Sequence, residues 1–350
     1  MKPFNLDALI RPNIRDLQPY RCARDDFDSG ILLDANENSF GSLVPSDLEL
    51  NRYPDPLQNK LREAVAGFRS VSREQVFMGS GSDEAIDLII RAFCEPQKDA
   101  ILITPPTYGM YKVSASINNN TVISVPLSPD FQLRVDDILE KAADARVIFL
   151  CSPNNPTANL LKRDDMLRVL KEFNGIVVVD EAYIDFCEGE TMVRELENHP
   201  NLIILQTLSK AFGMAGARLG IALASKEIIN VILKIKAPYN INSLTAQAGL
   251  KAFSQLDKMR QAVENILIER ERLIEELNKL EGVINIYPPD ANFILVKITN
   301  ALAIYHELAN RGVIVRYRGD QAHCEETLRV TVGTRKENDE LIHNLSQILS

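Results

Sequence analysis

The chain has 350 residues, of which 45% are hydrophobic and 25% are charged, values typical of globular proteins that exclude disordered and fibrous classes. This length allows one large domain or two unequal domains. The net charge of -9 disfavours nucleic acid as the main partner, although it leaves room for a local basic pocket.

The N-terminal sequence has no apolar core of the kind found in signal peptides, and no apolar run approaches the roughly 18 residues that a membrane span needs. We therefore expect a cytoplasmic protein without a membrane partner. The five cysteines are odd in number, widely spaced and free of any Cys-x-x-Cys pair, which favours reduced thiols over disulfides or zinc. The four histidines form no metal-binding motif, so no metal site is expected.

Short apolar runs recur in the first two thirds of the chain, each bounded by Pro, Gly, Asp or Ser. Such runs are typical of strands in a mostly parallel sheet that helices cover on both faces. The predicted strands are residues 100–103, 147–150, 176–179, 202–205 and 219–224. A stripe of apolar residues at helical spacing, from Ile86 to Phe93, follows capping-type residues at 82–84 and predicts a helix there.

The pattern changes near residue 260. A long amphipathic helix is predicted over residues 261–280 and ends at Gly282. Shorter elements follow, with predicted strands at 293–296, 313–315 and 328–332 and a helix at 301–310.

These patterns predict an α/β protein with a large, doubly wound, mainly parallel sheet domain and a smaller α+β domain. We expect residues 1–40 to form an N-terminal arm and part of the small domain. The other expected units are residues 41–260 as the large domain, 261–282 as the connecting helix and 283–350 as the small C-terminal domain.

Polar side chains follow three successive predicted strands. Asn155 comes after the strand at 147–150, Asp180 and Tyr183 after the next, and Lys210 after the strand at 202–205. Because ligands bind at the carboxyl ends of strands in such sheets, we expect these side chains to face one crevice. Taken singly, each has a plainer interpretation as a turn, core or solvated loop residue.

The stretch Gly79-Ser80-Gly81-Ser82-Asp83-Glu84 is a possible anion site. Its glycines permit close backbone approach, and the helix that it opens presents free N–H groups and a positive dipole end. It is not a dinucleotide fingerprint, since Glu84 occupies the third glycine position. Most isolated loops of this kind are helix starts without a ligand.

The combination is more specific than its parts. Asn155-Pro156, Asp180-x-x-Tyr183, Ser209-Lys210 and Arg218 resemble, in order and spacing, the fold type I pyridoxal-phosphate-dependent aminotransferases. Within that family the chain is most similar to the histidinol-phosphate aminotransferases, over about residues 12–340. The segments that carry this similarity are residues 17–20, 34–38, 51–54, 105–111, 237–239 and 328–334.

The resemblance implies catalytic roles for Lys210, Asp180 and Tyr183. Lys210 would bind the aldehyde of pyridoxal 5'-phosphate and then carry a proton between substrate and cofactor, which requires an ammonium group of lowered pKa. Asp180 would keep the pyridine nitrogen protonated. Asn155 and Tyr183 would donate hydrogen bonds to the 3'-oxygen of the ring.

Further cofactor contacts are implied at matching positions. Tyr108 would stack on the ring. The cofactor phosphate would be bound by Ser82, Asp83, Thr207, Ser209 and Arg218, and by Tyr53 of the other subunit. Because sites in this family are shared between chains, the resemblance implies a homodimer.

The substrate contacts implied by the resemblance are Tyr20, Asn155, Arg316 and Arg329, with Arg318 close enough to Arg316 to be confused with it. Two arginines suit a phosphorylated amino alcohol and a dicarboxylate, since both are anionic. The implied reaction is a ping-pong transfer of the amino group of L-histidinol phosphate to 2-oxoglutarate in histidine biosynthesis.

Other interpretations remain open at this point. Within the same fold they are a threonine-phosphate decarboxylase and a broad aromatic amino-acid aminotransferase. A catalytically silent, pyridoxal-phosphate-binding regulator would normally carry an added DNA-binding segment, which the composition does not support. One departure from the family pattern is Ala158, where a glycine is common, because a β-carbon restricts φ in that loop.

Overall fold

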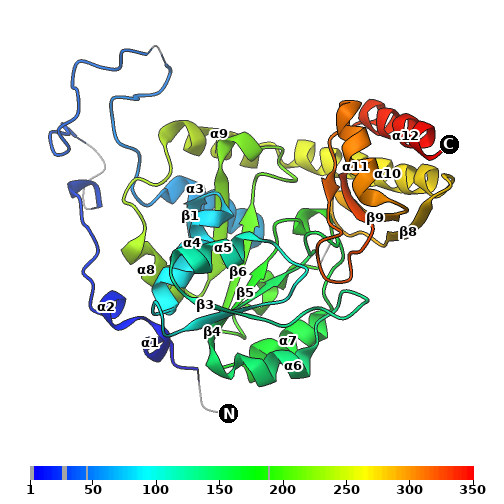
Figure 1. The fold of residues 1–350 in the computed structure, drawn as a ribbon. Coiled ribbons are helices and arrows are strands. Elements are labelled where there is room, and N and C mark those ends of the chain that lie inside the picture. Colours follow the sequence, from blue (N-terminus) through cyan, green and yellow to red (C-terminus); the bar gives the residue numbers. More distant parts are fainter. Residues whose placement is uncertain (1–3, 26–29, 45, 188–189) are drawn as a thin grey trace.

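The computed structural model describes residues 4–25, 30–44, 46–187 and 190–350. In this part of the chain, two sheets form the centres of two helix-covered bodies (Figure 1). The strands of the larger sheet are β1 Val76–Ser80, β2 Ala100–Ile103, β3 Thr121–Ser124, β4 Ala145–Cys151, β5 Ile176–Asp180, β6 Leu202–Thr207 and β7 Leu219–Ala224. Their order across the sheet is β1-β7-β6-β5-β4-β2-β3.

The larger sheet is mainly parallel, as the apolar runs predict. Strands β2 to β6 pair in parallel, and β7 runs antiparallel to both of its neighbours, β6 and β1. The reversal at β7 follows from the connection at residues 208–218, which has only a short 3-10 turn at Ala215–Ala217. A parallel neighbour needs a crossover of about a dozen residues or more, usually a helix.

Helices cover both faces of this sheet (Figure 1). On one face, α4 Ser82–Phe93, α5 Met110–Ile117 and α8 Lys226–Ile235 share a core with the sheet. The predicted stripe from Ile86 to Phe93 is fully buried there, and each such side chain stabilises the fold by about 1.5–3 kcal/mol. The helices on the other face are α3 Asn59–Arg69, α6 Val135–Lys141, α7 Arg163–Glu172 and α9 Ser243–Phe253.

The smaller sheet is antiparallel, with the order β10-β11-β9-β8. Its strands are β8 Val283–Tyr287, β9 Phe293–Ile298, β10 Arg316–Tyr317 and β11 Thr327–Thr331. The helices packed on it are α10 Leu256–Leu277, α11 Ala301–Asn310 and α12 Arg335–Leu349. Short 3-10 turns elsewhere are Ala23–Asp25, Arg73–Gln75, Ala142–Asp144, Ile184–Phe186 and Met192–Glu195.

Two predictions about this smaller body need correction. The long helix begins at Leu256, before the predicted residue 261, and ends at Leu277. The strand predicted at 313–315 is wrong. The backbone N–H of Val313 donates to the carbonyl of Leu308 at 2.9 Å, so the chain leaves the end of α11 here. Val313 and Val315 pack on the core, Ile314 is exposed, and β10 begins only at Arg316.

The N-terminal residues contact the larger body. Helices α1 Leu6–Leu9 and α2 Pro12–Arg15 lie beside α8, and Leu9 and Ile10 are buried in the core that α4 and α8 share. The sequence predicts instead that part of residues 1–40 belongs to the smaller domain. The chain then runs outward as a long irregular segment before it returns to α3 (Figure 1). No helix in the described ranges has the length and apolar character that a lipid bilayer would require.

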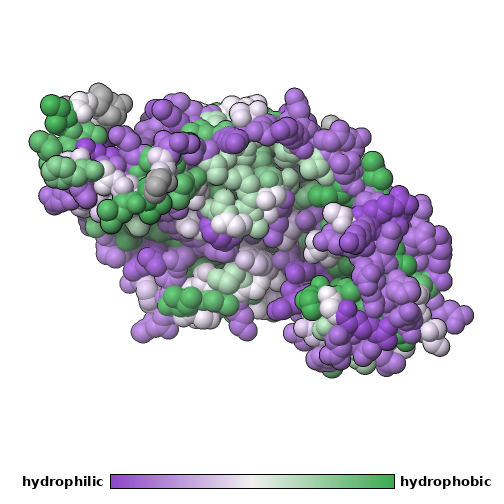
Figure 2. All heavy atoms as spheres, turned by 90° about the horizontal axis from the view of Figure 1, so that it is seen from above, coloured by the Kyte–Doolittle hydropathy of each residue, from purple (hydrophilic) through white to green (hydrophobic). Residues whose placement is uncertain are grey.

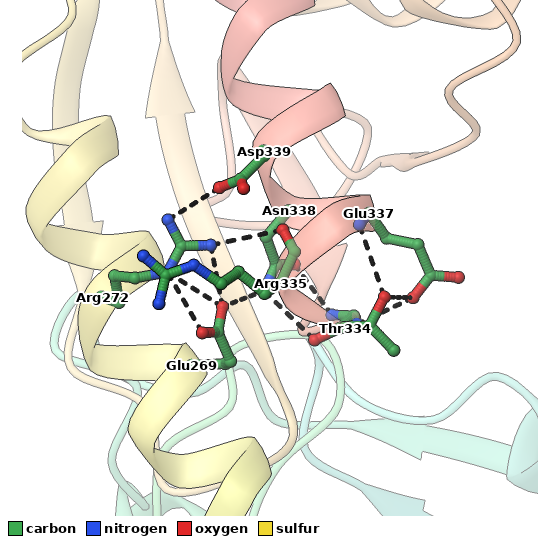
Figure 3. A network of polar contacts seen from close by, with 8 residues as sticks. Glu269, Arg272, Thr334, Arg335, Glu337, Asn338 and Asp339 are labelled. Carbon is green, nitrogen blue, oxygen red and sulfur yellow. Dashed lines mark hydrogen bonds and ion pairs between the residues drawn. The ribbon is translucent and has the colours of Figure 1, made fainter.

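A polar network joins the long helix α10 to the C-terminal helix α12 (Figure 3). Arg272 pairs with Glu269 on its own helix and with Asp339 on α12, both at 2.8 Å. Thr334 begins α12 as its N-cap, and its backbone N–H donates to the carboxylate of Glu337 at 2.7 Å. This capping box satisfies backbone donors that the first turn of a helix leaves free.

Replacing Thr334 with alanine is expected to lower the free energy of unfolding by about 1 kcal/mol, because the N–H of Glu337 loses its side-chain acceptor. Urea unfolding at an unchanged m-value measures the loss. Ser346→Ala is the matched control, since this hydroxyl lies within α12 and donates to the carbonyl of His343 one turn earlier on the same helix. Equal midpoints for Thr334→Ala and the control would refute the capping role.

Candidate active site

A cavity of about 600 Å³ lies at the carboxyl ends of β4, β5 and β6, where the smaller body meets the larger one. Most of the predicted site residues line this cavity, although they come from segments spread over some 250 positions of sequence. The predicted residues that line it are Ser82, Asp83, Tyr108, Asn155, Asp180, Tyr183, Thr207, Ser209, Lys210, Arg218, Arg316 and Arg329. Its volume lies within the range of about 300–1,000 Å³ that is typical of small-molecule sites.

Lys210 projects into this cavity from the loop that follows β6. Its Nζ lies 5.5 Å from the centre of the Tyr183 ring, and it has no hydrogen-bond acceptor within the described part of the chain. Burial lowers the pKa of this amine, the Arg329 guanidinium lowers it further, and Asp180 opposes the shift. A larger share of the amine is therefore unprotonated, and nucleophilic, than in a lysine exposed to water.

Asp180 ends β5 and is only 3% exposed. Its Oδ1 accepts the backbone N–H of Ala182 at 3.1 Å, and its Oδ2 accepts the hydroxyl of Tyr111 at 2.6 Å. Burial raises the pKa of the carboxyl to about 6, while these two hydrogen bonds oppose the rise. The carboxylate is thus a buried anion whose charge is available to a cationic partner in the cavity.

Asn155 and Arg329 join the two bodies across the cavity. The Arg329 side chain leaves β11 and donates to Oδ1 of Asn155, with a separation of 2.5 Å. Its guanidinium also lies 5.5 Å from the centre of the Phe293 ring, and Phe293 packs edge-on against Tyr183 at 5.0 Å. Burial lowers the pKa of Arg329, as does the nearby Arg316. In the described structure neither arginine has a carboxylate partner within ion-pair distance.

The N-terminus of α4 forms the opposite end of the cavity. Arg218 reaches over it and lies 3.5 Å from both Asp83 and Ser209, while Tyr108 donates to Asp83 at 3.0 Å. Thr207 donates to Ser209 at 3.0 Å. Free backbone N–H groups, hydroxyls and one guanidinium therefore converge here, a combination suited to an anion.

Glycines make this end possible by allowing parts of the protein to approach each other. Gly81 has a φ of 76°, and a β-carbon there would collide with the Arg218 guanidinium. A β-carbon on Gly220 would collide with the backbone of Gly81 and Ser82. The glycines thus serve first to pack β7 and Arg218 against the loop that opens α4, which brings the positive charge to the helix N-terminus.

Comparison with known proteins decides the family. Residues 31–345 match the family model described as aminotransferase class I and II. The chain belongs to this aminotransferase family. A protein of Cytophaga hutchinsonii named histidinol-phosphate aminotransferase is 50% identical over 342 residues, covering 97% of this chain and 98% of its own length.

Solved structures of aminotransferases share the fold. The histidinol-phosphate aminotransferase from Clostridium acetobutylicum matches with a TM-score of 0.79 and 26% identity, over 85% of this chain and 91% of that one. The enzyme of the same name from Sinorhizobium meliloti, solved in complex with pyridoxal-5'-phosphate, matches with a TM-score of 0.81 and 22% identity, over 90% and 89%.

The aminotransferase cavity also contains residues that the sequence interpretation did not select. Arg318 lines it beside Arg316, and its buried Nε has no hydrogen-bond partner among the described residues. In a strand, side chains two positions apart point to the same face, as these two arginines do. Strand β10 ends at Tyr317, and both side chains line the same cavity. The Arg316-x-Arg318 pair was the available signal. Thr107 and Tyr111 lie in the segment 105–111 that carries the resemblance, but no site role was predicted for either.

Two predicted residues lie outside the cavity. Tyr20 and Tyr53 are on the projecting segment, with exposed fractions of 71% and 51%. The Tyr53 ring stacks on Tyr239 at 4.5 Å, and its backbone N–H donates to Glu37 at 2.6 Å. The structure therefore does not bring Tyr20 to the site of its own chain, and its contact with substrate stays a prediction.

The loop after Asn155 keeps a left-handed residue despite the missing glycine. Ala158 has a φ of 70° and is fully buried. Its N–H donates to the carbonyl of Asn154 and its carbonyl accepts the N–H of Asp290, both at 2.8 Å. These hydrogen bonds and its packing hold a conformation that an L-residue rarely adopts.

Proposed function

We propose that this aminotransferase transfers the amino group of L-histidinol phosphate to 2-oxoglutarate, yielding imidazole acetol phosphate and L-glutamate as a step of histidine biosynthesis. The observation that carries the proposal is one cavity that contains an amine of lowered pKa, a buried carboxylate and arginines without a carboxylate partner in the described structure. The name shared by relatives at about half identity supports the choice of substrate.

The residues of the cavity fit pyridoxal 5'-phosphate, which we propose as the cofactor. Ser82, Ser209 and Arg218 surround the α4 N-terminus and would hold its phosphate. The Thr107 hydroxyl, which lines the cavity, is buried without a partner in the described structure and offers one further group to a ligand. Lys210 and Asp180 would hold the aldehyde and the ring nitrogen. When bound, the cofactor supplies an electron sink.

The protein's own side chains provide the remaining chemistry. The Lys210 amine removes the proton from the substrate carbon that bears nitrogen and returns it to the adjoining cofactor atom, acting as general base and then general acid. Its lowered pKa brings the amine nearer to the operating pH. Asp180 provides the negative charge that keeps the ring nitrogen protonated, and Asn155 and Tyr183 orient the ring.

Arginines would bind the anionic groups of both substrates. Arg329 and Arg316 line the cavity from the smaller sheet and have no carboxylate partner in the described residues, so each is free to bind a phosphate or carboxylate. An amino alcohol phosphate and a dicarboxylate differ in shape but share an anionic end. One cationic pair therefore serves both halves of a ping-pong reaction.

We also propose a homodimer. The projecting segment carries many apolar residues on its surface (Figure 2), and those that are more than 60% exposed are Tyr20, Ile31, Leu33, Phe40, Leu43 and Val44. Exposing these apolar side chains to water costs free energy, and large exposed apolar patches mark interaction sites. A second copy of the chain would cover them and would receive Tyr53 at its cofactor phosphate.

Arg329→Ala is expected to raise the KM for 2-oxoglutarate about 10- to 100-fold, because a charged hydrogen bond contributes about 1.5–3 kcal/mol. The dissociation constant of the cofactor should change far less. Steady-state kinetics and cofactor titration measure the two effects separately. Arg311→Ala is the control, since that arginine is exposed at the C-cap of α11 and pairs with Glu307. Equal losses in both measurements would remove Arg329 from the substrate site.

The substrate is tested by absorbance titration of the purified holoenzyme with L-histidinol phosphate, phenylalanine and threonine phosphate, each without a keto acid. Low concentrations of L-histidinol phosphate are expected to bleach the yellow band of the lysine-bound cofactor, and 2-oxoglutarate should restore it. A yellow protein that does not respond to L-histidinol phosphate would contradict the substrate while leaving the cofactor in place. Carbon dioxide release from threonine phosphate would indicate the decarboxylase instead.

A further inference from the structure

Tyr111 contacts two residues that line the cavity, Asp180 and Tyr108, and is fully buried in the first turn of α5. Its ring stacks on Phe149 of β4, with centroids 4.7 Å apart and planes at 15°, and meets the edge of Tyr108 at 5.6 Å. Its hydroxyl donates to Oδ2 of Asp180 at 2.6 Å. A core aromatic residue is thus hydrogen-bonded to the buried carboxylate of the site.

This contact is one of the two hydrogen bonds that the Asp180 carboxylate accepts in the described structure. A buried tyrosine hydroxyl needs a partner, and a backbone carbonyl would satisfy it equally well. Here the partner is a carboxylate that accepts only one other hydrogen bond in the described structure, from the N–H of Ala182. Arginine and lysine make no ion pair with Asp180 there, so these two donors are the groups that contact its charge directly.

We propose that Tyr111 is a positioning residue of the reaction, whose hydroxyl holds the Asp180 carboxylate in its ionised form and in one orientation. The inference rests on the proposed function, since an ionised Asp180 is what the ring nitrogen of the cofactor requires. A hydrogen bond to the charged form of an acid stabilises that form relative to the neutral one. Burial of Tyr111 raises the pKa of its hydroxyl well above the ordinary value, so it keeps its proton and remains a donor.

Other titratable groups also face Asp180. Asp83 at the start of α4 disfavours its charge, whereas Lys210 favours it. The neighbouring groups that titrate only at higher pH are Tyr108, Cys151 and Tyr183, each with its pKa raised by burial. They stay neutral in the range where Asp180 ionises. Of the hydrogen bonds that oppose the effect of burial on Asp180, the one from Tyr111 is the larger.

Tyr111→Phe tests the proposal, because it keeps the ring on Phe149 and removes only the donor. The acid limb of the kcat–pH profile is expected to move to higher pH by about one unit or more, since Asp180 then holds its proton more strongly. The second readout is the ¹⁵N NMR shift of the ring nitrogen in holoenzyme loaded with labelled cofactor and no substrate. It should move toward the value of an unprotonated pyridine.

Two further variants separate positioning from stability. Phe149→Leu loosens the same ring stack but keeps the hydroxyl, so it should lower Tm and leave both the acid limb and the ¹⁵N shift in place. Site-specific 3,5-difluorotyrosine at position 111 keeps the shape and donates a stronger hydrogen bond, so it should move the acid limb to lower pH even if Tyr111→Phe folds poorly. An unchanged ¹⁵N shift in Tyr111→Phe, with only Tm reduced, would overturn the proposal.

The NMR readout also separates this inference from the proposed function. If wild-type holoenzyme fails to use L-histidinol phosphate, the assigned substrate is wrong, yet the ¹⁵N shift still reports whether Tyr111 controls Asp180. If turnover is normal and the ¹⁵N shift of Tyr111→Phe equals that of the wild type, the function stands and the role of Tyr111 falls.

Discussion

Lys210→Ala is expected to reduce turnover by roughly 10⁴-fold or more and to abolish the yellow absorbance of the lysine-bound cofactor. The same amine is needed to hold the cofactor aldehyde and to move the substrate proton, and the described part of the cavity offers no second lysine for either step. Absorbance spectra and single-turnover kinetics with L-histidinol phosphate measure the two losses.

The fold should survive this substitution. Lys210 makes no hydrogen bond within the described residues, and burial lowers its pKa, which means that the folded state holds its charged form less well than water does. Removing Lys210 therefore removes the free-energy cost of burying its charge, and the unfolding midpoint should stay the same or rise. Lys251→Ala on the surface of α9 is the matched control. Normal turnover in the Lys210 variant would overthrow the whole catalytic scheme.

Asp180→Asn is expected to lower kcat about 10²- to 10³-fold, because it removes the negative charge that faces the ring nitrogen while keeping the shape of the side chain. The amide can still accept the N–H of Ala182 and contact the hydroxyl of Tyr111. Cofactor affinity should fall as well. Steady-state kinetics and cofactor titration measure these effects, with the exposed Asp257→Asn as control. A variant as active as the control would show that the charge is not used.

Asp180→Asn should lower activity but raise the free energy of unfolding of the apoprotein. The pKa of Asp180 is raised to about 6 in the folded apoprotein, so the ionised carboxylate is less favourable there than in the unfolded chain. Its contribution to stability is present below the ordinary aspartate range and is lost as the pH rises through about 6. Asp180→Asn lacks this loss, so its apoprotein should become more stable relative to the wild type between about pH 4 and 7. Urea unfolding across that range tests the sign.

Several elements could be predicted because local sequence is sufficient for them. The strand at Ala100–Ile103 and the helix at Ala301–Asn310 have the predicted bounds, since an apolar run or stripe with clear boundary residues leaves little choice. The strand predicted at 313–315 was wrong because an apolar run does not by itself distinguish a strand from a connection. Val313 and Val315 are only partly buried against the core, and Ile314 is exposed.

Some residues of the site could likewise be predicted from the sequence, and others could not. Asn155, Asp180 and Lys210 follow strands that are recognisable in the sequence, so their meeting at one sheet edge could be predicted from the fold class. The entry of Arg318 into the cavity could not, because it depends on how the smaller sheet packs against the larger body. Nor could the bond between Tyr111 and Asp180, which joins residues 69 positions apart.

The sequence by itself determined the fold class, the succession of strands and the chemical character of the groups at their ends, because periodicity and residue type are local properties. The tertiary structure alone decided the antiparallel direction of β7, the approach of Arg329 to Asn155 and the pKa values of Asp180 and Lys210. These depend on burial and on distances between segments remote in sequence. The energy of a charge in a protein is set by such surroundings, which no single stretch of chain contains.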